Sequence, residues 1–172
     1  MDWLQILLYA FSIFLVIYVF VFFYALESLI TFRSRLKKRT LAISLLLSEK
    51  KDVLLSMLAL MEKDIKDEST KEEATQVRWL KVNKLQAKEI ENCLNLLTSL
   101  QKRLVLFANN NEHGKSEEFL EYFDILNDLD ANYRKTAAIY NSDLLGYEYW
   151  RKTPLFRFWF FLFRFKEIKR LP

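Results

Sequence analysis

An uninterrupted apolar segment near the N-terminus constrains this chain more than any other feature of its sequence. Residues 3–26, WLQILLYAFSIFLVIYVFVFFYAL, hold 24 positions without a charged side chain. A helix of that length extends about 36 Å, and the hydrocarbon core of a bilayer is about 30 Å thick. The segment therefore predicts a single transmembrane helix.

A cleaved signal peptide is the alternative for such a segment, and the flanking residues argue against it. Signal peptides have a positive start, a shorter apolar region and a cleavage site of small residues. This chain starts Met-Asp and offers only YALES. The aromatic residues of the segment include Trp3, Tyr9, Tyr18 and Tyr24, and its last residue is Leu26. Trp3 and Tyr24 lie near the two expected interfaces, where aromatic rings settle.

Basic residues follow the apolar segment closely and are absent before it. They are Arg33, Arg35, Lys37, Lys38 and Arg39. Basic flanks of a transmembrane helix stay in the cytoplasm. We therefore expect a single-pass membrane protein with its N-terminus outside and the rest of the chain, from about residue 30, in the cytoplasm.

The remaining sequence predicts long helices. Only two glycines and two prolines occur in 172 residues, too few for the turns of a sheet protein. We expect an all-α fold, in which the transmembrane helix continues into an antiparallel up-and-down bundle of long helices and ends in a short aromatic helix. Its parts are a membrane anchor (1–32), a cytoplasmic helical bundle (33–150) and an aromatic, basic C-terminal segment (151–172).

Three helices are expected in the bundle. The first, 33–66, continues from the anchor. The second, 70–108, opens with a capping box of Thr70 and Glu73, and the third starts at Ser116. Asn83 and Gln101 interrupt the apolar stripe of the second helix, where they either set pairing with a partner helix or face another polar group inside the monomer. If these three helices run in turn away from, toward and again away from the membrane, the C-terminal segment begins about 50 Å from the bilayer.

Residues suited to catalysis are scarce. His113 is the only histidine, in a polar loop beside Gly114, and Cys93 is the only cysteine. We expect no enzyme, no cofactor, no metal and no small-molecule substrate. Residues 40–150 hold 14 basic and 19 acidic side chains, so the bundle is acidic and nucleic acid is not an expected partner.

Two short motifs resemble those of a known family. In the first bundle helix the matching positions are Leu47, Lys50, Lys51, Asp52, Val53, Leu54, Leu55 and Met57, with Leu55 where the family has proline. Near the end of the third helix the family repeats Tyr-Asn seven residues apart before a proline. The matching positions there are Tyr140, Asn141, Leu144, Tyr147 and Pro154, while Glu148 stands in place of the second asparagine and Ala137 replaces a usual arginine. With these motifs the chain resembles the LemA family of bacterial proteins.

The resemblance implies one N-terminal membrane helix and a bundle of long helices. The family has no settled biochemical function, although its members are often encoded near membrane metallopeptidases, which hints at membrane quality control. Tyr140 and Tyr147 lie two turns apart on one helical face. They are expected either as core tyrosines or, with Asn141, as a cluster that binds a partner.

The C-terminal segment, TPLFRFWFFLFRFKEIKRLP, is too interrupted for a second span. Its longest uncharged run, 158–163, has six residues, against about 20 needed to cross a bilayer. It can pack on the bundle, join a second subunit or lie on a membrane leaflet, and we expect packing, with Phe160 buried. The residues expected to contact lipid in the third case are Arg157, Arg164, Lys166, Lys169 and Arg170.

These features favour a membrane-anchored helical scaffold or adaptor of the LemA type, with a protein partner or a second copy of itself. The alternative is a membrane-associated enzyme or an accessory subunit of a membrane peptidase or quality-control system.

Overall fold

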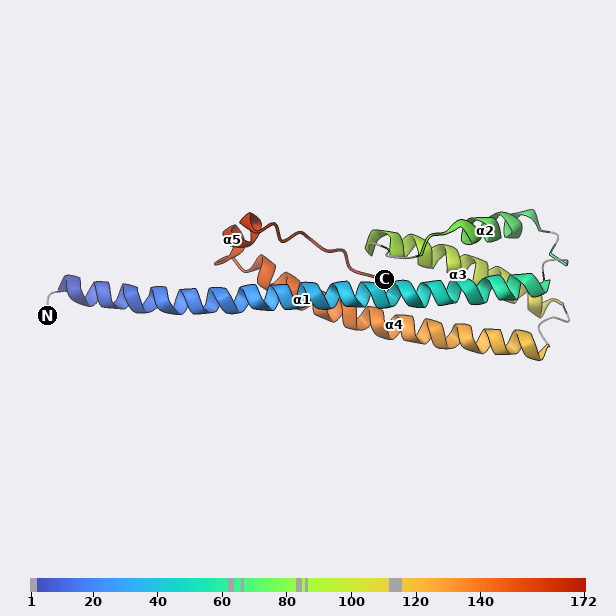
Figure 1. The fold of residues 1–172 in the computed structure, drawn as a ribbon, viewed down its shortest axis with the longest axis horizontal. Coiled ribbons are helices and arrows are strands. Elements are labelled where there is room, and N and C mark those ends of the chain that lie inside the picture. The colour runs from blue at the N-terminus through green and yellow to red at the C-terminus, as the bar shows by residue number, and fades with distance from the viewer. Residues whose placement is uncertain (1–2, 62–63, 66, 83–84, 86, 112–115) are drawn as a thin grey trace. The chain divides into compact units, whose positions relative to one another are not determined.

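The fold is described by a computed structural model over residues 3–61, 64–65, 67–82, 85, 87–111 and 116–172. All regular structure in these ranges is helical (Figure 1). The helices are α1 (Trp3–Met61), α2 (Glu68–Trp79), α3 (Ala87–Asn109), α4 (Glu117–Lys152) and α5 (Arg157–Leu162). The predicted all-α fold is confirmed, as is the unbroken continuation of the apolar segment into the first bundle helix.

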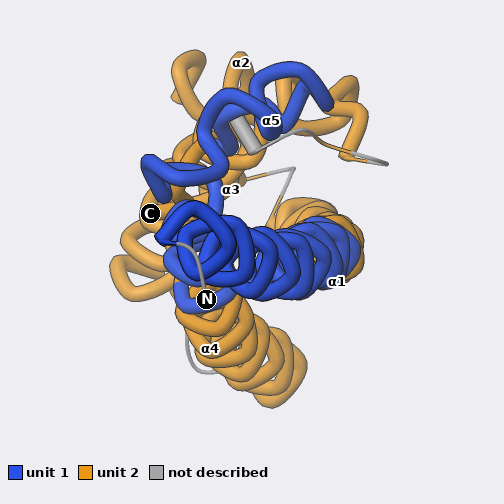
Figure 2. The backbone as a smooth tube through the Cα atoms, turned by 90° about the vertical axis from the view of Figure 1, so that its left-hand side faces the viewer, with its two compact units in different colours: residues 1–36, 142–168 blue, residues 37–141, 169–172 orange. Residues whose placement is uncertain are grey.

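The chain divides into two compact units (Figure 2). Unit 1 comprises Met1–Leu36 and Ser142–Ile168, and unit 2 comprises Lys37–Asn141 and Lys169–Pro172. Both α1 and α4 contribute residues to each unit. The first half of α1 is long and apolar enough to cross a membrane, and its most apolar stretch is unburied.

The core of unit 2 is built from apolar stripes on three helices. Its buried residues include Ile43, Leu47 and Leu54 on α1, Ile90, Leu97 and Leu104 on α3, and Leu126, Tyr133 and Ala137 on α4. Their spacing of four or seven residues places each set on one face of its helix. Lys50 lies within this core and donates to the Asp130 carboxylate at 2.6 Å, where Gln101 also donates at 3.2 Å. Gln101 therefore faces a polar group inside the monomer, one of its two predicted roles.

The starts of α2 and α4 depend on polar side chains. Ser116 Oγ accepts from the backbone N–H of Phe119 at 3.3 Å, which confirms the predicted start of α4. The predicted capping box of α2 is wrong, because Asp67 is the N-cap and accepts from the Thr70 N–H at 3.2 Å. Hydrogen bonds from the Thr70 and Ser69 hydroxyls lower the pKa of Asp67 to about 2. Thr70 lies within the first turn of α2.

The predicted second helix, 70–108, is two helices in the structure. Helix α2 ends at Trp79, where the Leu80 backbone becomes extended. Lys51 of α1 donates from Nζ to the carbonyl oxygens of Arg78 and Leu80 at 3.1 and 2.8 Å. A helix leaves its last carbonyls without partners, and Lys51 supplies a donor for them. Beyond this end, Val82 and Leu85 are buried, so the non-helical stretch also contributes to the core.

The additional helix changes the direction of α4. Within unit 1, α4 runs antiparallel to α1, and the Trp150 and Tyr24 rings meet at 5.7 Å. The chain therefore returns to the apolar segment before α5 begins. The C-terminal segment was expected to begin about 50 Å from the apolar segment, at the far end of three helical passes, but it lies against Phe22 of that segment because the chain makes four passes.

Removing one partner of the Lys50–Asp130 ion pair should lower the free energy of unfolding. Asp130→Ala leaves a buried, unpaired ammonium, so we expect the free energy of unfolding of the full chain in detergent micelles, measured with urea, to fall by about 3 kcal/mol. Asp128→Ala, an exposed carboxylate on the same helix, should change it by less than about 0.5 kcal/mol. The double variant Lys50→Met/Asp130→Leu should recover most of the loss. An Asp130→Ala protein as stable as the control would contradict the buried pair.

Candidate functional site

Unit 1 gathers the aromatic C-terminal segment onto the apolar half of α1. Phe22 is at the centre of this aromatic cluster, with ring centroids 5.8 Å from Phe156, 6.0 Å from Trp159 and 6.1 Å from Phe160. Phe156 and Phe160 are buried. Phe160 is thus a packing residue, as expected, but its partner Phe22 belongs to the predicted transmembrane segment and not to the bundle.

A polar contact accompanies the aromatic cluster. Trp159 donates from Nε1 to the Tyr18 hydroxyl at 3.1 Å, and the Tyr18 ring lies 5.6 Å from that of Phe156. Tyr18 and Phe22 are four residues apart on α1, so both face the same side of the helix. This side of the apolar segment is the surface on which α5 rests.

The chain reverses at the end of α5 in a Schellman motif. Phe165 N–H donates to the Phe160 carbonyl at 3.1 Å, and Arg164 N–H donates to the Phe161 carbonyl at 3.0 Å. The Phe160 and Phe165 rings meet at 5.7 Å, which is the apolar contact that accompanies this motif. Arg164 has a φ of 57°, in the left-handed region where glycine is the usual residue.

After this turn the last residues of the chain, 165–172, run back beside α4. We call them the tail, and the residues of the Tyr-Asn motif hold them. In unit 1, Tyr147 donates from its hydroxyl to the Lys166 carbonyl at 2.8 Å. In unit 2, Tyr140 donates to the Lys169 carbonyl at 3.1 Å. Seven residues of helix and three residues of extended chain both cover about 10 Å, so this spacing suits a tail that follows the helix.

Asn141 completes this attachment in unit 2. Its amide donates to the Leu171 carbonyl at 2.9 Å and its side-chain oxygen accepts from the Leu171 N–H at 3.1 Å. Burial raises the pKa of Tyr140 and of Tyr147, which keeps both hydroxyls protonated as donors. The motif that carries the LemA resemblance therefore binds the chain's own C-terminal backbone.

The basic residues predicted to set topology or contact lipid are all exposed. Those after the apolar segment are Arg33, Arg35, Lys37, Lys38 and Arg39. Those of the C-terminal segment are Arg157, Arg164, Lys166, Lys169 and Arg170. Arg35 lies over the Phe32 ring at 5.8 Å. Lys169 pairs with Glu91 at 2.7 Å within unit 2. Trp3, Tyr9 and Tyr24 are also exposed, whereas Tyr18 and Leu26 are half-buried.

Gly146 is a contact residue that the sequence analysis missed. A Cβ atom at this position would lie 2.5 Å from the Phe32 ring, so the absence of a side chain at Gly146 makes room for the ring in its present position in unit 1. A signal was present in the sequence, because one of only two glycines falls inside a predicted helix, where it costs about 1 kcal/mol.

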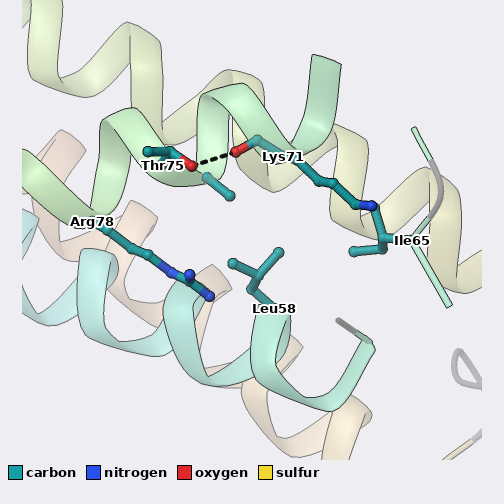
Figure 3. A pocket seen from close by; sticks show the side chains of 6 residues that line it. Leu58, Ile65, Lys71, Thr75 and Arg78 are labelled. Carbon is teal, nitrogen blue, oxygen red and sulfur yellow. Dashed lines mark hydrogen bonds between the residues drawn. The ribbon is translucent and has the colours of Figure 1, made fainter. Parts of the chain in front are cut away.

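Unit 2 contains a small pocket beside the end of α1 (Figure 3). It has a volume of about 240 Å³ and is lined by Leu58, Ile65, Lys71, Ala74, Thr75 and Arg78. Thr75 donates its hydroxyl hydrogen to the Lys71 carbonyl of its own helix at 2.8 Å. The pocket thus combines an apolar floor with two cations, and its one hydroxyl is already engaged.

The remaining candidates for chemistry have no site around them in the described part of the chain. Cys93 is buried in unit 2, and burial raises the pKa of its thiol to about 11 although Lys51 and Lys50 oppose the shift. No group of three His, Cys, Asp or Glu side chains in the described ranges could hold a metal ion. Asn83, His113 and Gly114 lie outside the described residues.

Comparison with known proteins adds no relative. The chain matches no protein-family model, no curated protein sequence and no solved structure.

The tyrosine hydroxyls should slow proteolysis of the tail. Tyr147→Phe removes the donor to the Lys166 carbonyl, so we expect trypsin to cleave after Lys166 about fivefold faster, the effect of losing about 1 kcal/mol. Tyr140→Phe should do the same after Lys169. Tyr149→Phe is the matched control, since that tyrosine on the same helix is 67% exposed and has no hydrogen bond to the tail among the described residues. Cleavage of the full-length protein in micelles is followed by mass spectrometry, and equal acceleration by the control would exclude these hydrogen bonds as the cause.

Proposed function

We propose that this protein is a membrane-anchored helical scaffold or adaptor that presents its bundle to a protein partner. The observation that carries the proposal is the continuity of α1, which begins as an exposed apolar helix and supplies core residues such as Leu47 and Leu54 to unit 2. An anchor that is the same helix as part of the bundle fixes the bundle at the membrane without a flexible linker. That arrangement supports a presenting role.

The proposed topology has the N-terminus outside and the bundle in the cytoplasm. It is supported by five exposed basic residues that follow the apolar segment, which are Arg33, Arg35, Lys37, Lys38 and Arg39.

A pair of fusions tests this topology. We expect a reporter that is active only in the cytoplasm to work after Pro172 and to fail before Met1, and the reverse result would reject the orientation. Exchanging the five basic residues for glutamine should produce a mixed orientation, because they are the main charge asymmetry around the segment. Exchanging Lys81 and Lys102, exposed basic residues far from the segment, is the control.

Membership in the LemA family is part of the proposal. It is supported by the motif positions that have structural roles, because Lys50 forms the buried ion pair and Tyr140, Asn141 and Tyr147 hold the tail. These contacts depend on the residue types that the motifs specify. An accessory subunit of a membrane peptidase is a specific form of the same scaffold role.

Trp79 marks the surface of unit 2 best suited to a partner. It is 81% exposed at the end of α2, beside the cations Arg78 and Lys81. Tryptophan and arginine dominate the binding energy of protein interfaces. The bundle therefore offers an anchor residue of the kind that interfaces use.

Photo-crosslinking from this surface tests the scaffold proposal. With a benzophenone amino acid in place of Trp79, we expect irradiated membranes to give one discrete adduct of the full-length protein, identified by mass spectrometry. An adduct of twice the chain's mass would identify a second copy as the partner. Gln76, exposed on the same helix, is the control position and should give no discrete adduct. Absence of any adduct at Trp79, or turnover of a substrate by the purified protein that is lost when a bundle residue is changed, would contradict the proposal.

A further inference from the structure

The outer side of the α5 region is apolar and uncovered. We call residues 153–165 the aromatic hairpin, since they lead away from α4, form α5 and turn back at Arg164. While Phe156 and Phe160 face α1, the exposed apolar residues of the hairpin include Leu155, Phe158, Phe161, Leu162 and Phe163, and Trp159 is 41% exposed. Phe158 and Phe161 are 70% and 83% exposed. Exposed aromatic side chains gathered in so short a segment normally contact a partner or a membrane.

We propose that the aromatic hairpin inserts into the membrane leaflet on the bundle side of the span and binds anionic phospholipid there. The proposal rests on the proposed membrane span, because α5 packs on the apolar half of α1. The hairpin contacts Tyr18 and Phe22 of the proposed span directly. If this part of α1 lies in a lipid leaflet, the outer side of the hairpin faces the same lipid.

The depth of the contact agrees with insertion into a leaflet. Phe22 and Tyr18 precede Leu26, the last residue of the uncharged segment, by four and eight positions. At the helical rise they lie about 6 and 12 Å inside the apolar boundary. Interfacial helices bury their apolar face about 5–10 Å into this zone. Phe22 lies within this range and Tyr18 slightly deeper, so the hairpin that contacts both is expected at or just below interfacial depth.

Several hydrogen bonds of the hairpin are formed within the protein. The Trp159 indole N–H and the Tyr18 hydroxyl are bonded to each other at 3.1 Å. Phe160 N–H donates to the Phe156 carbonyl at 3.0 Å, and Phe163 N–H donates to the Trp159 carbonyl at 2.9 Å. The Schellman bonds close the turn at Arg164. A lipid environment requires such internal pairing, because hydrocarbon offers no partner to a polar group.

Basic groups lie at the edge of the aromatic surface. A cleft of about 510 Å³ in unit 1 is lined by Arg151, Lys152, Arg157, Phe160, Phe161, Phe165 and Glu167. Arg151 pairs with Glu167 and Lys152 with Glu148, whereas Arg157 forms no ion pair among the described residues. A guanidinium that shares a cleft with aromatic rings suits the phosphate of a lipid whose acyl chains contact the rings.

Arg164 adds a second cation at the turn. Its left-handed backbone conformation would favour glycine, so an arginine there costs conformational free energy and contributes a charge in return. Like Arg157, it is exposed and forms no ion pair among the described residues. Two unpaired arginines beside exposed phenylalanines match an anionic leaflet better than a neutral one.

Spin labels in the full-length protein measure the insertion. In a Cys93→Ala background, a nitroxide is attached at Phe161→Cys, at Phe20→Cys in the span and at Glu121→Cys on the exposed side of α4. Nanodiscs contain phosphatidylcholine with phosphatidylglycerol. We expect the labels at 161 and 20 to collide with oxygen and to be shielded from a water-soluble nickel complex, and the label at 121 to behave oppositely.

The two labels in apolar positions separate the two proposals. Shielding at 20 with nickel access at 161 would overturn hairpin insertion and leave the span intact. Nickel access at both positions would overturn the span itself. A label at Phe158→Cys, on the same exposed surface, repeats the measurement in case the first hairpin variant does not fold.

Lipid selectivity is measured from Trp159. With Trp3, Trp79 and Trp150 changed to Phe, brominated phosphatidylglycerol should quench Trp159 about twice as strongly as brominated phosphatidylcholine at equal mole fraction, because Arg157 and Arg164 attract anionic headgroups and salt screens part of that attraction. Arg157→Gln with Arg164→Gly should bring the ratio to about one, and the exposed bundle variant Lys102→Gln should not change it. Equal quenching by both lipids in the unmodified arginine background would overturn the assignment to anionic phospholipid.

Discussion

Lys51 donates from Nζ to the carbonyl oxygens of Arg78 and Leu80, and the direction of every later helix depends on the helix end that these bonds stabilise. If the segment continued as one helix, it would carry the chain past α1 in a single pass. Because α2 ends at Trp79 and α3 begins at Ala87, the chain reverses once more, and α4 runs antiparallel to α1. The aromatic segment consequently meets Phe22.

The long helices could be predicted because their signals are local. Scarcity of glycine and proline, apolar residues at intervals of three and four, and the Ser116 cap are all visible in the sequence. The end of α2 is different, since residues 80–86 contain no glycine or proline and fit a helix by propensity. A lysine 27 positions before Arg78 supplies the donor that favours the break. Such a tertiary contact has no signature within the segment that it ends.

The difference between local signals and tertiary contacts also applies to the aromatic cluster and to the attachment of the tail. The spacing of Tyr140 and Tyr147 placed them on one helical face, but their acceptors are backbone carbonyls, which every residue possesses and no sequence pattern marks. Arg164 occupies a left-handed position at which glycine is usual, and a glycine there would have predicted the turn from the sequence. The basic and aromatic composition of residues 151–172 suggested both protein packing and lipid contact. The structure shows the protein contact, and its location on α1 motivates the proposed lipid contact.

The bond between Trp159 and Tyr18 joins residues 141 positions apart, which has a consequence for biosynthesis. Tyr18 leaves the ribosome with the first part of the chain and Trp159 with almost the last. During that interval Phe22 lacks its three partners from the C-terminal segment, Phe156, Trp159 and Phe160. Assembly of unit 1 is therefore a late event, completed after translation of the bundle. A chain that terminates before residue 156 would keep the apolar helix and lose the aromatic side chains that pack against it.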